Sequence, residues 1–386
     1  MNNYKSILKF LYLNTFFYII KLFLFFYETN QRENKLLIVK LDAIGDYVLF
    51  RNFIKIIKES EKYKDFEITF VGNINVQSIS EWLDGKYIDQ FVWIDKKKIF
   101  KNPFYLIRLL TKIGCRFNTA LQPTYSRELL GDYLIKFSKA KTKITFAGDT
   151  NNLKQEDKND TDKWYTNLIK LNDDTVFDFS KNKEFFEIVI EETINLNLPL
   201  IDKSEIESIN WPENLTQPLK YAILFPGASA AKRRWPTSKF AEIANYIKNN
   251  YHLDIIICGS KNDTVIAQEI IKKANPDIID ATGKTNLKEL VLLIAKASIL
   301  ITNDTSAAHI GPALSIPTIA LSQYNHYGRF LPYPPQEGLH NICITPELYS
   351  PLSFSDKCQK FALGSDVDIN LIETSQVTKA IQQILS

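Results

Sequence analysis

A chain of 386 residues exceeds the usual size of one hydrophobic core, so we expect two domains. The 47 basic and 44 acidic residues leave a net charge of +3, which gives no polyanion-binding signal, and nucleic acid is not an expected partner. The four cysteines form no CxxC pair and the four histidines no paired ligand spacing, so neither a disulfide framework nor a metal site is expected.

Residues 6–27 form a strongly apolar and aromatic segment, SILKFLYLNTFFYIIKLFLFFY, which Lys9, Asn14 and Lys21 interrupt. A cleaved signal peptide is not expected, because no small residues mark a cleavage site. A membrane span is one alternative, since the two lysines could reach opposite headgroup layers. A helix packed on its own domain is another. We favour a helix that lies in the membrane interface, within an N-terminal unit of residues 1–34.

The first strand is predicted at residues 35–41, KLLIVKL, whose nearly continuous apolar character is typical of a buried parallel strand. The turn DAIGD follows it, and apolar residues then recur at helical spacing over residues 47–57. Gly45 and Asp46 therefore fall at the carboxyl end of the strand, where open α/β sheets bind ligands. Asp46 could instead cap the helix. Further strands at residues 66–71, 90–94 and 118–121 predict a doubly wound domain over residues 35–210.

The strand at residues 118–121 opens onto the polar loop QPTYSR. Gln122 and Arg127 in this loop are candidates to bind a phosphorylated or acidic acceptor, or they are ordinary surface residues. Residues 149–162 are polar and charged without an apolar period, which indicates a mobile surface segment. The pairs Trp211-Pro212 and Gln217-Pro218 break helical continuation and indicate a domain boundary.

The alternation of strands and helices then restarts, which predicts a second doubly wound domain over residues 211–386. A strand at residues 221–225 leads into the turn PGAS and the basic triplet KRR at residues 232–234, which could also be a solvated charge run. Another strand, at residues 253–258, ends in GSKND. Its Asp263 is a candidate for the ribose of a nucleotide or a helix cap. A helix at residues 287–297 precedes a strand at residues 299–302.

Residues 301–309, ITNDTSAAH, join this strand to a helix predicted at residues 307–314. Backbone N–H groups at such a crevice bind anions. Asp304 and His309 flank the turn, so the pattern predicts a site for a phosphate that carries a polyhydroxy group. The alternative is an Asn-Asp-Thr helix cap with a buried histidine.

Three blocks of the sequence lie in order at the predicted strand-to-helix junctions: IVKLDAIGDYVL, FPGASAAKRRWPTSKFAEIANYI and ATGKTNLKELVLLIAKASILITNDTSAAHIGPALSIPTIAL. Together they resemble glycosyltransferase family 9, the lipopolysaccharide heptosyltransferase family, over residues 35–325. The resemblance implies the GT-B architecture, in which two Rossmann-like doubly wound domains face a central cleft. The N-terminal apolar helix lies outside the resemblance.

The resemblance also implies roles for individual residues. Asp46 would be the carboxylate near the acceptor and the general base of an inverting transfer. Ser229 and Arg233 would contact the donor diphosphate and offset the charge on the leaving group. The residues that match the donor-binding turn are Asp304, Thr305, Ser306 and His309. Arg233 stands where the family usually has Lys, and Ser306 where Gly is common, so both departures bear on the donor.

We therefore expect a metal-independent glycosyltransferase that uses no cofactor. It would move a sugar, heptose or similar, from a nucleotide diphosphate sugar to a glycolipid or oligosaccharide acceptor of the lipopolysaccharide core or another surface glycan. The alternatives are a sugar-nucleotide epimerase or hydrolase of the same fold and a catalytically silent sugar-nucleotide binding protein, against which Asp46 argues. A dehydrogenase is disfavoured because no GxGxxG follows either first strand. The expected location is the cytoplasm, at the inner face of the cytoplasmic membrane through residues 6–27.

Overall fold

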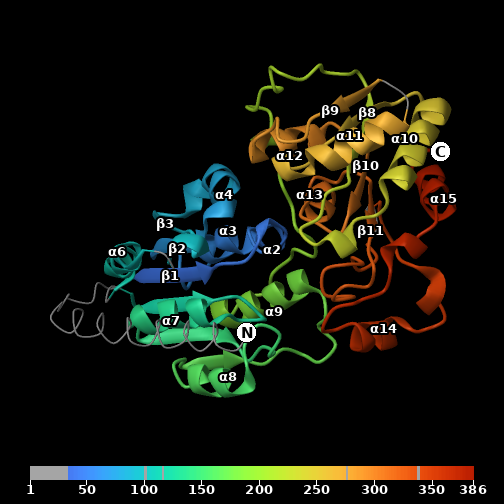
Figure 1. Ribbon diagram of the computed structural model, residues 1–386. Coiled ribbons are helices and arrows are strands. Elements are labelled where there is room, and N and C mark those ends of the chain that lie inside the picture. The colour runs from blue at the N-terminus through green and yellow to red at the C-terminus, as the bar shows by residue number, and fades with distance from the viewer. Residues whose placement is uncertain (1–33, 100–101, 115–116, 275–276, 337–339) are drawn as a thin grey trace.

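The computed structural model describes residues 34–99, 102–114, 117–274, 277–336 and 340–386, which form two halves around two parallel six-stranded sheets (Figure 1). The expectation of two doubly wound sheets is confirmed. The predicted apolar helix at residues 6–27 lies outside the described residues. Within the described ranges, no helix is long and apolar enough to cross a membrane.

The first sheet is built around β1 (Lys35–Lys40), whose neighbours are β2 and β4 in the strand order β3-β2-β1-β4-β5-β6. Leu36 pairs with Ile68 on one side and with Thr119 on the other. Helices cover both faces of the sheet, which explains the continuous apolar run of β1. The other strands are β2 (Glu67–Asn73), β3 (Gln90–Ile94), β4 (Thr119–Gln122), β5 (Thr142–Phe146) and β6 (Asn167–Ile169).

The helix predicted at residues 47–57 is two helices, α2 (Ile44–Val48) and α3 (Asn52–Glu59), so the predicted bounds are wrong. The break places Tyr47 and Arg51 so that both bind the buried Asp84, through Tyr47 Oη and Arg51 Nη2. Gly45 and Asp46 therefore lie inside α2. The remaining helices of this half are α4 (Gln77–Leu83), α5 (Lys96–Ile99), α6 (Pro103–Ile113), α7 (Leu129–Phe137), α8 (Gln155–Asp162) and α9 (Asp178–Ile190).

The prediction of a mobile segment at residues 149–162 is wrong, because its second part forms α8. The buried face of α8 is polar, with Lys158 and Thr161 buried and Asp162 paired with the buried Arg127. An apolar period is therefore missing although the helix packs on its neighbours.

The second sheet repeats the topology of the first, in the order β12-β11-β10-β7-β8-β9. The strands predicted at residues 221–225, 253–258 and 299–302 are confirmed as β7 (Tyr221–Phe225), β8 (Asp254–Ile257) and β10 (Ile299–Asn303). The other strands are β9 (Ile278–Asp280), β11 (Thr318–Leu321) and β12 (Asn341–Ile344), and the helices are α10 (Thr237–Tyr251), α11 (Thr264–Lys273), α12 (Leu287–Ala295), α13 (Ala307–Ala313), α14 (Phe354–Lys360) and α15 (Thr374–Leu385).

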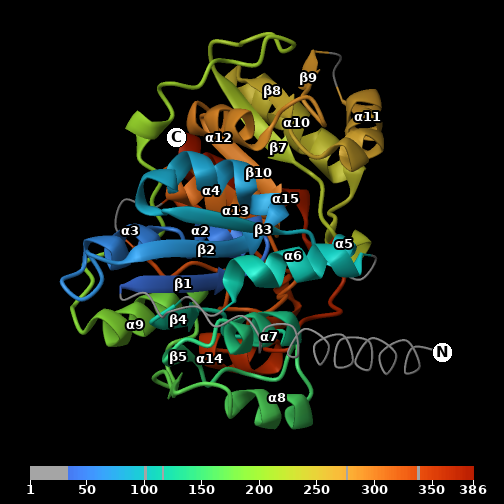
Figure 2. The ribbon, with the colours of Figure 1, turned by 90° about the vertical axis from the view of Figure 1, so that its left-hand side faces the viewer.

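The two halves pack on each other through α2 and α4 of the first and α12 and α13 of the second (Figures 1 and 2). One apolar cluster runs from the first sheet through these helices to the second. The strand order reverses between β1 and β4 and again between β7 and β10. Ligands of open α/β sheets bind at such reversals, beyond the carboxyl ends of the strands. The domain bounds at residues 35–210 and 211–386 stay a prediction.

Candidate active site

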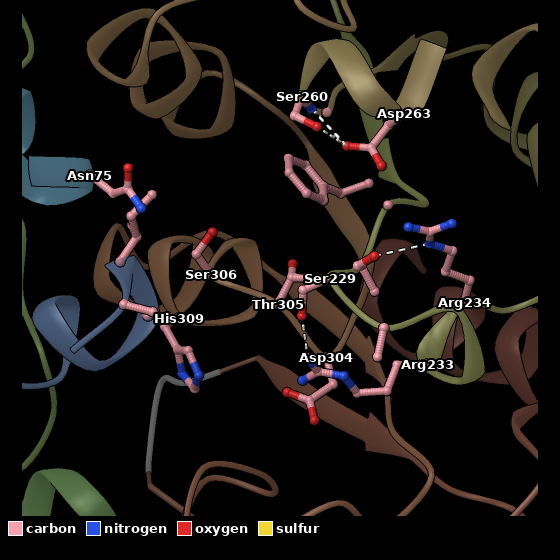
Figure 3. Close-up of a pocket in the computed structure, with 18 of the residues that line it drawn as sticks. Asn75, Ser229, Arg233, Arg234, Ser260, Asp263, Asp304, Thr305, Ser306 and His309 are labelled. Atoms are coloured by element: carbon pink, nitrogen blue, oxygen red, sulfur yellow. Dashed lines mark hydrogen bonds between the residues drawn. The ribbon is translucent and has the colours of Figure 1, made fainter. Parts of the chain in front are cut away.

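A cavity of about 1050 Å³ lies between the two halves, at the carboxyl ends of β1, β7 and β10. The first half contributes residues 43–46 and Asn75 to its wall, and the second half contributes the other lining residues. Figure 3 shows Asn75 and His309 at one side and the groups of the second sheet at the other. Among the predicted site residues, the cavity is lined by Asp46, Ser229, Arg233, Asp263, Asp304, Thr305, Ser306 and His309.

The basic side of the cavity follows β7. Arg233 Nη2 donates a hydrogen bond to Ser229 Oγ, and Arg234 Nε donates to the carbonyl of Ala228 over 2.9 Å (Figure 3). Trp235 anchors this segment, because its side chain is 1% exposed and its Nε1 donates to the carbonyl of Ile372. The anchored tryptophan holds two guanidinium groups at the cavity, and such groups can bind phosphate in a bidentate manner.

Asn303, the last residue of β10, joins the basic segment to the donor turn. Its Nδ2 donates to the carbonyl of Pro226 over 2.7 Å, and its Oδ1 accepts from the N–H of Trp235 over 3.2 Å. The side chain is fully buried. The two hydrogen bonds of Asn303 therefore connect the turn after β7 to the turn after β10.

The turn after β10 carries Asp304, Thr305 and Ser306 into the cavity, and Ser306 is the N-cap residue of α13. Burial raises the pKa of Asp304 to about 6, against the opposing positive charge of Arg233. Asp304 is thus ionised at neutral pH and able to accept hydrogen bonds from hydroxyl groups.

Asp263 combines the two roles that the sequence left open. Its Oδ2 accepts from the N–H and Oγ of Ser260, at 2.8 and 2.7 Å, in a capping box before α11. Its carboxyl group also packs closely against Gly227, where an added Cβ would lie 2.5 Å from Asp263 Cγ. Asp263 is therefore a cap that lines the cavity, and a ribose contact stays a prediction.

His309 joins α13 to the first half. Its Nδ1 lies 3.1 Å from Tyr333 Oη, and burial lowers its pKa to about 4, so the ring is neutral at pH 7. A Cβ added to Gly45 would lie 2.9 Å from His309 Cδ2. Glycine at position 45 thus lets α2 approach α13.

Gly45→Ala is expected to lower the stability of the protein by about 1 to 3 kcal/mol, because the added methyl group overpacks against a buried ring. The matched control is Gly85→Ala, since a Cβ there meets no heavy atom within 4 Å. Urea unfolding of both variants measures the difference. Equal stability of the two variants would contradict the close approach.

Asp46 lies in the first turn of α2, half-buried in the cavity wall. The N-cap of α2 is Ala43, so Asp46 is not the cap that the sequence allowed. Within the part of the chain that the structure describes, its carboxylate has no hydrogen-bond or ion-pair partner. A carboxylate without an internal partner at a cavity wall is available to a ligand.

The charges around Asp46 suit a base. Burial raises the pKa of Asp46 to about 7, helped by the negative charges of Asp42 and Asp178 and opposed by Lys40 and Arg329. Lys40 and Asp42 form their own ion pair, with Nζ and Oδ2 2.9 Å apart. A carboxylate whose pKa lies near the working pH is matched to accepting a proton.

Comparison with known proteins decides the family. The protein-family sequence model described as "Glycosyltransferase family 9 (heptosyltransferase)" matches residues 133–349, more than half of the chain. The chain belongs to glycosyltransferase family 9.

Curated relatives of this family 9 chain match it over part of their length. The lipopolysaccharide core heptosyltransferase OpsX of Haemophilus influenzae is 32% identical over 168 residues, which cover 43% of this chain and 47% of the relative. Lipopolysaccharide heptosyltransferase 2 of Salmonella typhimurium is 32% identical over 101 residues, 25% of this chain and 29% of the relative. The chain thus aligns with less than half of the length of these relatives.

Solved structures share the fold of this family 9 chain. The glycosyltransferase of family 9 from Veillonella parvula has a TM-score of 0.68 and 20% identity, with 92% of this chain and 99% of that chain covered. Heptosyltransferase WaaC of E. coli, solved with ADP, has a TM-score of 0.65 and 12% identity, with 90% and 97% covered. The likeness confirms the expected GT-B arrangement of two facing sheets.

The structure does not bring Gln122 and Arg127 to the cavity. Gln122 is 2% exposed and accepts a hydrogen bond from Tyr165 Oη. Arg127 is 1% exposed and pairs with Asp132 and Asp162. Both side chains are bound to internal partners in the first half, so an acceptor contact by either residue stays a prediction.

Several residues in or around the cavity carried no assignment in the sequence. Asn303 stands inside the NDT motif, but its side chain forms hydrogen bonds with residues far away in the chain. Asp178 and Arg329 act on Asp46 from 132 and 283 positions further along, and no motif marks either of them. The residues that do line the cavity and that carried no assignment include Asn75, Arg234, Asn325, His326 and Phe330.

Proposed function

We propose that this protein is an inverting glycosyltransferase that moves a heptose or similar sugar from a nucleotide diphosphate sugar to an acceptor in the lipopolysaccharide core or another surface glycan. Membership of glycosyltransferase family 9 supports the reaction class. The observation that carries the proposal is Asp46, a carboxylate with a pKa of about 7 and with no hydrogen-bond partner among the described residues, in the wall of a cavity that Arg233 also lines.

The proposed reaction is a single displacement at the anomeric carbon of the donor sugar. The acceptor hydroxyl forms the new C–O bond while the bond from that carbon to the diphosphate breaks on the opposite face. Asp46 removes the hydroxyl proton, and the nucleoside diphosphate leaves with the bonding electrons. Arg233, Arg234 and Ser229 offset the negative charge that builds on the leaving group.

This chemistry assigns no step to a metal or a cofactor. The guanidinium groups of Arg233 and Arg234 would offset the charge on the diphosphate, because guanidinium can bind phosphate in a fixed, bidentate geometry. Among the described residues, no group of three or more His, Cys, Asp or Glu side chains could hold a metal ion. Transfer in the presence of a chelator tests this part of the proposal.

The donor we propose is ADP-heptose or a close analogue. WaaC has been solved with ADP and with ADP-2-deoxy-2-fluoro heptose. In this protein, Asp304 at the donor turn would accept hydrogen bonds from sugar hydroxyls, and Thr305 and Ser306 would lie at the phosphates.

The function is tested in two assays. The purified protein is incubated with ADP-heptose and lipopolysaccharide core acceptor, and acceptor-dependent release of ADP is measured together with the mass of the product. Mass spectrometry of surface glycan from a strain that lacks the gene should show the loss of one sugar residue. Release of nucleotide without any acceptor would favour a hydrolase, and an interconverted nucleotide sugar would favour an epimerase. Tight binding without turnover would favour the silent binding protein.

We also propose that residues 6–27 attach the enzyme to the inner face of the cytoplasmic membrane. Removal of residues 1–30 is expected to move the protein from the membrane fraction to the supernatant, because apolar and aromatic side chains bury in the interface. Transfer to a soluble acceptor analogue should be unchanged. Quantitative immunoblots of both fractions measure the effect, and an unchanged membrane fraction would contradict attachment through this segment.

A further inference from the structure

The ion pair between Asp178 and Arg329 joins the two halves beside the cavity, because Phe330, the residue after Arg329, lines the same cavity as Asp46. Arg329 follows β11 in the second half, and Asp178 is the first residue of α9 in the first half. Arg329 Nε donates to Asp178 Oδ1 over 3.1 Å, and the N–H of Asp178 donates back to the carbonyl of Arg329 over 2.8 Å. Arg329 Nη1 also donates to Ser126 Oγ over 2.5 Å and lies 3.7 Å from Asp149 Oδ2. One guanidinium of the second half is thus held by three side chains of the first.

The segment that carries Arg329, residues 322–333, is held in a strained conformation. Tyr324 and His326 have positive φ angles of 68° and 49°, which residues with a Cβ rarely adopt, and Gly328 has a φ of 80°, which glycine adopts readily. Tyr324 Oη donates to the carbonyl of Pro346 over 2.5 Å, and a Cβ added to Gly328 would lie 2.4 Å from Cys358 Sγ. Such conformations persist where the surroundings over-determine them, and they cluster at functional sites. The strained segment therefore presents Arg329 to α9 in a fixed place.

The charged groups that act on Asp46 come from three parts of the fold: Lys40 and Asp42 at the end of β1, Asp178 on α9 and Arg329 on the strained segment. Lys40 and Asp42 are paired with each other. His309 lies on α13, which packs on α2, the helix that carries Asp46. Its ring is neutral at pH 7 because burial lowers its pKa to about 4. Asp178 raises the pKa of Asp46, and Arg329 lowers it.

We propose that Asp178 and Arg329 are positioning residues for Asp46: as an ion pair that spans the two halves, they balance the charge at the base while residues 322–333 lie against α9. The proposal rests on the proposed role of Asp46 as general base and deepens it. It makes the base depend on the contact between the halves, because each half supplies one charge of the pair. Neither residue lines the cavity, so both act through Asp46 and not on the substrate.

The test is the pH dependence of kcat/KM for the acceptor in the full-length wild type, Asp178→Asn and Arg329→Gln. Asn keeps an oxygen that accepts from Arg329 Nε, and Gln keeps a donor toward Asp178, so both variants retain a hydrogen bond across the halves. The acidic limb is expected to move to lower pH in Asp178→Asn and to higher pH in Arg329→Gln. Arg329→Lys, which keeps the charge, should leave the limb near its wild-type place.

At a fixed pH on the acidic limb, kcat/KM relative to the plateau of the same variant should rise by about threefold in Asp178→Asn and fall by about threefold in Arg329→Gln. A half-unit displacement of a one-proton limb requires a change of this size. A merely structural ion pair would lower both plateaus and move neither limb. The matched control is Asp162→Asn, which removes a carboxylate bound to Arg127 outside the cavity and should move nothing.

Carboxyl ¹³C titration of aspartates, with the Asp46 signal assigned by its loss in Asp46→Asn, follows the same shifts without turnover. Wild-type turnover combined with limbs that stay in place, or that move the same way in both variants, would overturn this proposal alone. Absence of wild-type turnover would overturn the proposed function, and the ¹³C titration would then decide whether the pair acts on Asp46. Opposite displacements in either measurement support it.

Discussion

Asp46→Asn is expected to lower turnover by about 10²- to 10⁴-fold, the usual contribution of a general base, while the affinity for the nucleotide sugar stays nearly unchanged. In the proposed mechanism the carboxylate acts on the acceptor proton, whereas the donor diphosphate would lie at the guanidinium groups of the second half. Turnover and donor binding by calorimetry, measured on the same preparation, separate the two effects.

The wild-type pH profile belongs to the same prediction. A base must be deprotonated to work, and burial raises the pKa of Asp46 to about 7. The value of kcat/KM should therefore fall as the pH drops through about 7 and level off above it, and Asp46→Asn should lose this limb.

The matched control for Asp46→Asn is Asp65→Asn, the same substitution at an exposed position of the first half. It should keep wild-type turnover. A helix cap at position 46 would behave like the control, because Asn caps helices as well as Asp does. Wild-type turnover in Asp46→Asn would therefore remove Asp46 from the mechanism and leave the base to be found elsewhere in the cavity.

Arg233→Ala is expected to weaken binding of the nucleotide diphosphate sugar by about 10- to 100-fold, since hydrogen bonds to charged groups contribute roughly 1.5 to 3 kcal/mol. Its guanidinium is bound to Ser229 at the cavity, beside the turn that carries Asp304. Isothermal titration with ADP and with the nucleotide sugar measures the loss.

The neighbouring Lys232 provides the control. Its Nζ binds the carbonyl of Ser365 over 3.0 Å and the carboxylate of Asp366 over 2.6 Å, so the ammonium is already paired within the second half. Lys232→Ala removes the same charge from the same segment and should change donor affinity by less than about threefold, as for an exposed ion pair. Equal losses in both variants would show that net charge, and not the position of Arg233, governs donor binding.

Strand-to-helix junctions could be predicted from the sequence because they depend on neighbours in the chain. The apolar run of KLLIVKL and the turn after it placed Asp46 at the carboxyl end of β1, and the NDT turn was placed after β10 in the same way. The repeated alternation of strands and helices was enough to predict two parallel sheets.

The errors arose where a polar residue is buried by distant partners. Arg127 was predicted to contact the acceptor or to be an ordinary surface residue, but its side chain is buried against Asp162, which lies on a helix without an apolar period. Gln122 is likewise covered by Tyr165, 43 positions further along. Local patterns show the polarity of a side chain. They do not show the hydrogen-bond and ion-pair partners that offset the free-energy cost of its burial.

Which residue types stand at the site is therefore a property of local sequence, whereas their electrostatic state is a property of the assembled halves. Asp46 was found from its turn, but its pKa of about 7 depends on burial and on charges that α9 and residues 322–333 bring to it. Desolvation and Coulomb energy depend on distances in space, which the order of residues along the chain does not contain. Packing of α2 against α13, where His309 approaches Gly45, brings the two halves together at the site.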